Sequence, residues 1–349
     1  MPKYSCPKPS GAKPDFNNLL KVLRRQKPDR PTLFEFFLND PLYRALAGKQ
    51  AEKFNASSPY DHERLVIQAY HNAGYDYAPV PGSRFVFPSG THHQSQTRSL
   101  NEGGLIKDRR SFEEYPWPEP DNFDCNMLAG LADDLPDGMK LIVYGPGGVL
   151  ENVIMLAGFD NLCWLMADEP KLTMEIFDAV GSRLLKHYQK ALKYETVGAI
   201  ISNDDWGFKT QPMLSPADMR KYVFPWHKQI TAAAHNAGKP AILHSCGNLD
   251  AVMNDITDDI GYDAKHSYED VIKPVEDAYE ALHGKIAVLG GIDVDFITRS
   301  APDQVYRRSR AMVERAGERG AYALGTGNSV PEFIPHENYF AMLAAARDQ

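Results

Sequence analysis

Short apolar runs, rich in β-branched and aromatic residues, recur along the chain and are separated by longer stretches with helical periodicity. Residues 168–193 and 215–238 show that periodicity clearly, and the second stretch begins with Ser-Pro and ends at Gly238. The apolar runs have the length and composition of buried strands. Eight such runs are present, at residues 32–37, 75–80, 141–146, 198–204, 240–246, 262–267, 286–293 and 321–328.

Eight strands that alternate with helices predict an α/β fold, namely a (β/α)8 TIM barrel. A doubly wound sheet is the alternative, but no GxGxxG motif follows the first run. No linker-like segment or short repeat interrupts the pattern, so residues 1–349 are expected to form one domain. Residues 1–30 are read as an N-terminal extension with a helix. Residues 82–138 are too polar and proline-rich for a simple crossover, and we expect a small β excursion near the barrel mouth.

Composition narrows the function classes. The chain is 43% hydrophobic and 24% charged, with a formal net charge of -8 and a pI near 5.8. An acidic balance without a basic cluster argues against nucleic acid or an anionic membrane as a partner. There is no run of 18 apolar residues and no signal peptide, and the four cysteines show no CxxC pair. We therefore expect a cytoplasmic protein.

The fifth run ends in the sequence His-Ser-Cys-Gly. Side chains alternate along a strand, so His244 and Cys246 should point to the same side. Imidazole and thiolate are good zinc ligands, and catalytic groups of TIM barrels lie at the C-terminal ends of the strands. The alternative is a buried cysteine beside a hydrogen-bonded histidine with no metal. The third metal ligand is expected to be His266 or Glu269, one βα unit further along.

Other polar residues lie at the ends of the runs or inside them. One of Asp204 and Asp205 is expected to cap a helix and the other to orient substrate, and the sequence leaves open which. Glu35, a carboxylate inside an apolar strand, needs a buried partner and is a candidate catalytic residue, as is Tyr268. The residues expected to bind substrate are Trp206, Asn152, Thr326, Asn328 and Asp293.

Three segments resemble a known family: residues 144–180 (YGPGGVLENVIMLAGFDNLCWLMADEPKLTMEIFDAV), residues 244–248 (HSCGN), and the closing LGGID and YALGTGNSVPEFIPHENYFAML. They resemble the uroporphyrinogen decarboxylase-like superfamily of (β/α)8 barrels, and the resemblance runs from Arg30 onward. The superfamily contains porphyrinogen decarboxylases and zinc methyltransferases that use corrinoid proteins, thiols or methylated substrates.

Individual positions place the chain nearer the methyltransferase branch. His244 and Cys246 match the His-x-Cys of that branch, which the decarboxylases lack. Thr326 stands where thiol-methylating members carry a further cysteine and decarboxylases a histidine. The arginine-rich motif of the decarboxylases is replaced by FEFFLNDP at residues 34–41.

The resemblance therefore implies a zinc-dependent methyltransferase that moves a methyl group between a small methylated substrate and a corrinoid protein or another acceptor. The chain has no corrinoid-binding motif of its own, so a corrinoid would be carried by a partner protein, and a homodimer is left open. One alternative is a metal-free decarboxylase of a porphyrinogen-like or other small carboxylated substrate. Another is a barrel with a structural His/Cys pair and different chemistry.

Overall fold

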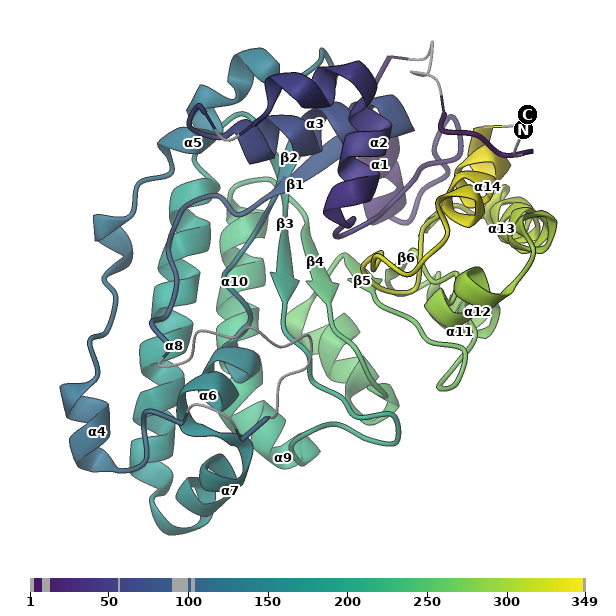
Figure 1. The fold of residues 1–349 in the computed structure, drawn as a ribbon. Coiled ribbons are helices and arrows are strands. Elements are labelled where there is room, and N and C mark those ends of the chain that lie inside the picture. The colour runs from purple at the N-terminus through teal and green to yellow at the C-terminus, as the bar shows by residue number, and fades with distance from the viewer. Residues whose placement is uncertain (1–2, 8–12, 56, 90–99, 102–103, 348–349) are drawn as a thin grey trace.

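The strands form one parallel sheet whose order follows the sequence. The computed structural model describes residues 3–7, 13–55, 57–89, 100–101 and 104–347. The sheet has seven strands in the order β1 to β7, and it curls so that helices cover its outer face (Figure 1). The strands are β1 (Tyr77–Val80), β2 (Lys140–Tyr144), β3 (Val197–Asn203), β4 (Ala241–His244), β5 (Ala264–His266), β6 (Ala287–Leu289) and β7 (Tyr322–Ala323).

The predicted barrel is therefore confirmed in its strand positions and parallel order, but its closure is not that of a regular eight-stranded barrel. The first predicted run, residues 32–37, forms an isolated parallel bridge between Leu33 and Leu324 next to β7. Within the described residues, no backbone hydrogen bond joins this run to β1.

Tyrosine hydroxyls, instead of the backbone of β1, form hydrogen bonds with the backbone of the first predicted run. The Tyr77 hydroxyl accepts from the Glu35 backbone N–H at 2.7 Å and donates to the Glu35 carbonyl. The Tyr70 hydroxyl lies 3.3 Å from the same carbonyl and 3.2 Å from that of Phe36. Buried backbone N–H and C=O groups need hydrogen-bond partners. In a closed barrel β1 would supply these partners to an eighth strand, and here the two tyrosine hydroxyls supply them.

The helices form the outer layer. In Figure 1, α8 and α10 lie alongside β3 and β4, and α11 to α14 cover the side of β5 to β7. The helices are α1 (Phe16–Leu23), α2 (Asp40–Ala47), α3 (Asp61–Ala73), α4 (Arg109–Glu114), α5 (Asn126–Gly130), α6 (Val149–Ala157), α7 (Phe159–Asp168), α8 (Pro170–Ala191), α9 (Pro216–Asp218), α10 (Phe224–Asn236), α11 (Val275–Leu282), α12 (Val294–Arg299), α13 (Pro302–Ala316) and α14 (His336–Arg347).

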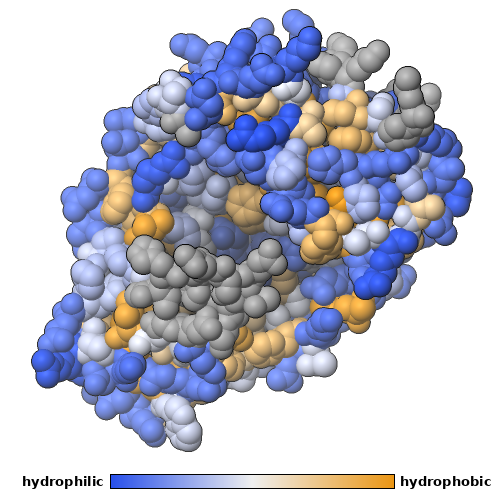
Figure 2. Space-filling view, viewed as in Figure 1, coloured by the Kyte–Doolittle hydropathy of each residue, from blue (hydrophilic) through white to orange (hydrophobic). Residues whose placement is uncertain are grey.

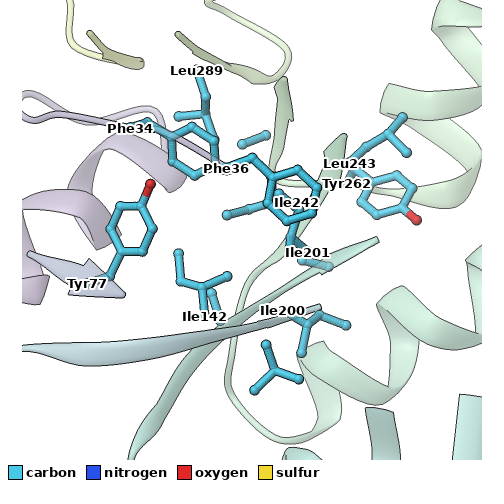
Figure 3. Packing of buried hydrophobic residues seen from close by; sticks show 14 of the residues in the cluster. Phe34, Phe36, Tyr77, Ile142, Ile200, Ile201, Ile242, Leu243, Tyr262 and Leu289 are labelled. Atoms are coloured by element: carbon cyan, nitrogen blue, oxygen red, sulfur yellow. The ribbon is translucent and has the colours of Figure 1, made fainter. Parts of the chain in front are cut away.

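Strand alternation divides the core into an inner and an outer part. Phe34, Tyr77, Ile142, Ile242 and Leu289 converge inside the curled sheet (Figure 3), and each is at most 1% exposed. Side chains on the other face of the strands pack against the helices. The inner cluster fills the interior below the strand ends, so polar chemistry is confined to the mouth.

The register brings three polar side chains into one layer at the mouth. Asn203 of β3 is the partner of His244 in β4, and His244 is the partner of His266 in β5. Partners in neighbouring parallel strands share a face, so these three side chains point into the curled sheet.

The segment predicted as a β excursion, residues 82–138, contains no strand among its described residues. It contains α4 and α5, and it runs along α8 (Figure 1). Arg183 of α8 donates to the Pro118 carbonyl at 2.9 Å, and Lys190 donates to the Pro120 carbonyl at 2.6 Å. The expectation of a β excursion was therefore wrong for these residues, because backbone carbonyls of the segment bond to side chains of α8 instead of to a second strand. Residues 90–99 and 102–103 lie outside the described residues, so a covering of the mouth stays a prediction.

Among the described helices, none is by itself long and apolar enough to cross a membrane. The pair α6 and α7 meets that criterion only when the two are taken together, by length and composition, and they are bent by 94° at their junction.

Candidate metal centre

Three side chains from two neighbouring strand ends form a group with the composition of a metal site. Asp205 follows β3, and His244 and Cys246 stand at the end of β4. One ligand atom of each lies within 4.8 Å of the other two, and the Cys246 Sγ is 3.9 Å from the His244 Nε2. Within the part of the chain that the structure describes, no other group of three His, Cys, Asp or Glu residues meets this test. His244 and Cys246 thus point the same way, as alternation predicts.

Two glycines allow the turns after β3 and β4 to approach each other. A Cβ added to Gly247 would lie 2.2 Å from backbone atoms of Gly207, and Gly247 has a φ of +88°. The turns are joined by a hydrogen bond from the Asn248 N–H to the Phe208 carbonyl at 2.7 Å. A side chain at Gly247 would force the turns apart, and with them Asp205 and Cys246.

Hydrogen bonds fix Cys246 in the group. Its backbone N–H donates to the Asp205 Oδ1 at 2.8 Å, and the Asn328 Nδ2 lies 3.2 Å from its sulfur. Burial, and then the nearby Asp205 carboxylate, raise the pKa of the Cys246 thiol to about 12. Ser267 and Lys265 act in the opposite direction. Without an added cation the thiol therefore keeps its proton at neutral pH.

Lys265 is a residue that the sequence reading missed. It lies in the middle of β5 and is 3% exposed. It donates to the carbonyls of Ser245 at 3.2 Å and Ser267 at 2.6 Å, and so ties the turn before Cys246 to the end of β5. Burial lowers its pKa to about 8, and the neighbouring thiol and carboxylates oppose that shift. Only its position in an apolar run could have indicated a buried lysine.

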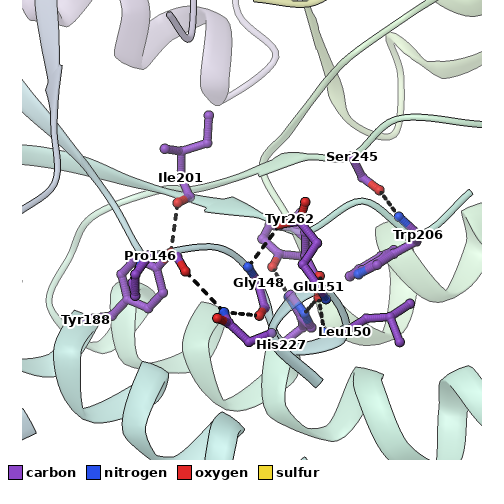
Figure 4. Close-up of polar contacts among 12 residues, drawn as sticks. Pro146, Gly148, Leu150, Glu151, Tyr188, Ile201, Trp206, His227, Ser245 and Tyr262 are labelled. Carbon is purple, nitrogen blue, oxygen red and sulfur yellow. Dashed lines mark hydrogen bonds and ion pairs between the residues drawn. The ribbon is translucent and has the colours of Figure 1, made fainter. Parts of the chain in front are cut away.

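The structure separates the two adjacent aspartates. Asp204 is fully buried and faces the N-terminus of α6, where its carboxylate accepts from the backbone N–H groups of Leu150 at 3.0 Å and Glu151 at 2.9 Å. It also pairs with the His227 Nε2 at 2.8 Å. Figure 4 shows His227 next to Leu150 and Glu151 at the start of this helix. Asp204 thus caps a helix, and half-buried Asp205 faces the metal group.

Glu151, in the first turn of α6, is a second residue that the sequence reading missed. Its carboxylate accepts from the Gly148 N–H at 3.2 Å and is half-buried beside Asp205. Burial, together with the charges of Asp204 and Asp205, raises the pKa of the Glu151 carboxyl. It therefore holds its proton to a higher pH than an ordinary glutamate. A glutamate three residues into a helix resembles an ordinary capping box, which hid this signal.

The two residues expected as a third ligand lie outside this group. His266 is fully buried, with its Nδ1 2.8 Å from the His244 Nδ1 and its Nε2 3.1 Å from the Thr326 carbonyl oxygen. Both of its nitrogens are occupied, and burial lowers its pKa to about 3. Glu269 is half-buried, one turn further from β5, and is not a member of the group. The structure therefore presents Asp205 as the third candidate ligand.

Glu35 and Thr326 meet behind the mouth. Glu35 is fully buried, and its Oε1 accepts from the Thr326 N–H at 2.7 Å, while its Oε2 lies 2.7 Å from the Thr326 hydroxyl. Burial raises the pKa of the Glu35 carboxyl to about 8, although both contacts with Thr326 lower it. Glu35 is not exposed at the mouth in this structure and supports the turn after β7, and its expected catalytic role stays a prediction.

Three residues expected to bind substrate make contacts that hold the scaffold, and their role toward a substrate stays a prediction. The Asn152 Nδ2 donates to the carbonyls of Pro146 and Gly148, at 3.2 and 2.6 Å. Asp293 caps α12 by accepting from the Phe296 N–H at 2.9 Å, and it also lines the cleft described next. Trp206 is fully buried against His227, and its Nε1 has no hydrogen-bond partner among the described residues.

Asn328 and Tyr268 line an open cleft near the metal group. The cleft has a volume of about 840 Å³, and Phe296, Asp293 and the exposed Phe333 also line it. The Tyr268 hydroxyl is buried and has no hydrogen-bond partner in the described part of the chain, and its ring lies 4.4 Å from the Lys265 ammonium. Figure 2 shows that this view of the molecule is hollowed near its centre, with hydrophobic and hydrophilic residues around the hollow.

Aromatic rings flank the metal group on the side of the first predicted strand. The Phe36 ring lies 4.8 Å from the His244 ring, and the Tyr144 ring is 5.5 Å from Phe36 and 4.9 Å from Phe37. The His244 ring is therefore held against an apolar wall that limits water on that side.

Comparisons with known proteins agree with this fold. A solved methyltransferase from Methanosarcina mazei superposes with a TM-score of 0.66 at 14% sequence identity, over 95% of this chain and 97% of that one. A putative vitamin-B12 independent methionine synthase from Listeria monocytogenes gives a TM-score of 0.47 at 11% identity, over 92% and 99%. No curated protein matches the sequence. At 14% sequence identity the likeness to the Methanosarcina mazei protein concerns the fold alone, and the superposition with a TM-score of 0.47 supports no conclusion.

A family model decides the membership. The model described as Uroporphyrinogen decarboxylase (URO-D) matches residues 16–349, which confirms the resemblance carried by the strand-end motifs. The chain therefore belongs to the uroporphyrinogen decarboxylase (URO-D) family.

Proposed function

We propose that the protein is a zinc-dependent methyltransferase that moves a methyl group between a small methylated substrate and an acceptor. The observation that carries this proposal is the convergence of Asp205, His244 and Cys246 within 4.8 Å at the mouth of the curled sheet. Three protein ligands with an open fourth position are typical of catalytic zinc, whereas structural zinc sites are closed by four.

The donor set fits zinc in chemistry and in size. Sulfur, imidazole nitrogen and carboxylate oxygen are its usual ligands, and in a tetrahedral site such atoms lie about 3.4–3.7 Å apart. The Cys246 Sγ and the His244 Nε2 are already 3.9 Å apart, and the Asp205 carboxylate would approach them from within 4.8 Å. When bound, zinc would lower the pKa of the Cys246 thiol and act as a Lewis acid toward a substrate thiol, oxygen or nitrogen.

The other residues supply binding and protons. Asn328 donates to the Cys246 sulfur and would hold it in place. The Glu151 carboxyl, which keeps its proton to higher pH, lies beside Asp205 and would protonate an amine or alkoxide that has lost its methyl group. Phe36, Phe37 and Tyr144 would exclude water from the reacting methyl group.

The large cleft beside Asn328 offers an approach for the acceptor. A corrinoid carried by a partner protein is the acceptor that the methyltransferase branch suggests, and a cytoplasmic location and a homodimer remain predictions. Thr326 cannot replace the further cysteine of thiol-methylating members, because a hydroxyl is not an anionic ligand near neutral pH. The site would therefore contain one thiolate, with Asp205 as the additional anion.

Zinc content tests the proposal. We expect about one zinc per chain in the zinc-loaded wild-type protein, measured by elemental analysis after dialysis, and loss of that zinc in Cys246→Ser. Cys163→Ser is the matched control, because Cys163 is exposed on α7 and far from the strand ends in the sequence. Methyl transfer is followed as methylcobalamin consumption in the presence of a panel of thiols, or as methylcobalamin formation from methylated amines and ethers with chemically reduced cob(I)alamin as the acceptor.

The alternatives give different results. A wild-type protein that retains no zinc but releases CO2 from a porphyrinogen would be a decarboxylase. A protein that retains no zinc and shows neither activity would have a structural His244 and Cys246 pair. Either result contradicts zinc-dependent methyl transfer.

A further inference from the structure

A chain of three contacts connects the metal group to the turn after β7. The Thr326 carbonyl oxygen is 3.1 Å from the His266 Nε2, the His266 Nδ1 is 2.8 Å from the His244 Nδ1, and the His244 Nε2 is 3.9 Å from the Cys246 Sγ. His266 and His244 are both buried. A neutral imidazole can carry its proton on either nitrogen, and this tautomer decides which nitrogen donates and which accepts in each contact.

If both imidazole rings are neutral, only one assignment of donors and acceptors fits these contacts. A carbonyl oxygen only accepts, so the His266 Nε2 carries the proton that reaches Thr326. In a neutral imidazole the other nitrogen is then a lone pair, and the His266 Nδ1 must accept. The donor in the 2.8 Å contact is therefore the His244 Nδ1–H.

The reverse direction would require a charged His266. A doubly protonated ring could donate from both nitrogens, but it would be fully buried in contact with the Thr326 carbonyl, a second histidine and the Phe34 ring. A buried cation without an anionic partner costs several kcal/mol. The neutral arrangement is favoured for this reason.

The surroundings of His266 preserve this geometry. The Phe34 ring packs edge-on against it with centroids 5.3 Å apart. Gly290 has a φ of +67°, and an added Cβ would lie 2.3 Å from the Thr326 carbonyl oxygen and 2.9 Å from the His266 Nε2. Glu35 in turn binds the Thr326 N–H, so the carbonyl that orients His266 is itself anchored.

We infer that His266 is a positioning residue that holds the proton of His244 on Nδ1 and so presents the Nε2 lone pair of His244 toward Asp205 and Cys246. This inference deepens the proposed function, because a histidine ligates a metal through an unprotonated nitrogen whose partner nitrogen is usually fixed by a hydrogen bond. It also gives His266 a role other than that of a third ligand.

The tautomers can be observed without metal. In chelator-treated protein with 15N-labelled histidine, long-range 1H–15N correlation spectra at neutral pH distinguish the two tautomers of each ring. We expect the Nδ1–H form for His244 and the Nε2–H form for His266, with the His244 signals assigned by their absence in His244→Gln. An Nε2–H form for His244, or exchange between its two forms, would overturn the inference.

Two substitutions at His266 form a matched pair. The amide of asparagine reaches the place of Nδ1 and can still accept from His244, whereas the amide of glutamine reaches the place of Nε2 and leaves the His244 Nδ1–H without its acceptor. We expect His266→Asn to keep zinc affinity within a few-fold of wild type and His266→Gln to weaken it about 10–100-fold. Equal losses in both variants would contradict a positioning role.

The outcomes also separate this inference from the proposed function. A wild-type protein with the expected tautomers but no zinc binding contradicts the zinc enzyme and leaves the arrangement of the histidines intact. If neither variant folds, the wild-type spectrum still decides the question.

Discussion

Thr326 binds both carboxyl oxygens of Glu35, although the two residues are 291 positions apart in the sequence. The Thr326 hydroxyl also contacts the Asn328 carbonyl oxygen. The hydroxyl has one hydrogen for two acceptors, the Glu35 Oε2 and that carbonyl, so it can donate to only one of them at a time. The turn that carries Asn328 toward Cys246 is thus anchored to a buried carboxyl group in the first predicted strand.

The pH dependence of the free energy of unfolding should report the protonation of the Glu35 carboxyl in the folded protein. The Glu35 pKa is raised to about 8 from 4.5, so between these pH values the folded protein holds a proton that the unfolded chain releases. Stability from this group is therefore present below pH 4.5 and is lost, by about 1.4 kcal/mol per pH unit, as pH rises toward 8. We expect Glu35→Gln to reduce this decline, measured by urea unfolding at pH 5 and pH 8.

Glu151 also has a raised pKa and contributes with the same sign, so the informative quantity is the difference between wild type and Glu35→Gln. An identical loss of stability from pH 5 to pH 8 in both proteins would show that Glu35 is charged in the folded state.

Substitution of Asp204 should lower the stability of the fold much more than substitution of Asp205. Asp204→Asn weakens a buried pair with His227 and the cap of α6, and we expect a loss of about 3 kcal/mol in the free energy of unfolding. Asp205→Asn should change stability by less than about 1 kcal/mol, because the amide oxygen can still accept from the Cys246 N–H.

Zinc affinity should show the reverse order. Asp205→Asn removes a candidate ligand, so its loss should exceed the roughly 10–100-fold typical of an outer hydrogen-bond partner. Chemical unfolding and competition with a zinc chelator measure the two quantities. Retention of full zinc affinity in Asp205→Asn would exclude Asp205 as a ligand.

Lys265 should influence the reactivity of Cys246. Its positive charge stabilises the thiolate, so Lys265→Met should raise the thiol pKa further and slow alkylation of Cys246 at pH 7, which is below the lysine pKa of about 8. Peptide mass spectrometry after timed iodoacetamide treatment measures the rate at this cysteine. Lys273→Met is the control, since Lys273 pairs with Asp250 in an exposed ion pair. Faster alkylation in Lys265→Met would refute the electrostatic role.

Tyr77 should be essential to the irregular closure of the sheet. Tyr77→Phe removes the hydroxyl that serves the backbone N–H and carbonyl of Glu35, and unsatisfied buried groups cost about 1–3 kcal/mol. Tyr322→Phe is the matched control, because the buried Tyr322 hydroxyl has no hydrogen-bond partner within the residues that the structure describes. We expect unfolding measurements to show a loss for Tyr77→Phe and little change for Tyr322→Phe. Equal effects would mean that the hydroxyl of Tyr77 does not support closure.

The positions of the strands and the residue types at their ends could be predicted from the sequence. Seven of the eight apolar runs coincide with β1 to β7, and His244 and Cys246 lie on one side of a strand end. These are local properties, since burial sets the apolar runs and the period of two sets the side on which each side chain lies. A parallel order then places all strand ends at one mouth.

Only the tertiary structure decided which polar groups contact one another at the mouth. Whether Asp204 or Asp205 faces Cys246 depends on where α6 begins, and whether His266 has a free nitrogen depends on a carbonyl 60 residues away. The run at residues 32–37 has the composition of a strand, yet Tyr70 and Tyr77 take the backbone groups that a ladder would use. Such contacts join distant segments whose approach is fixed by packing, and no local pattern in the sequence records them.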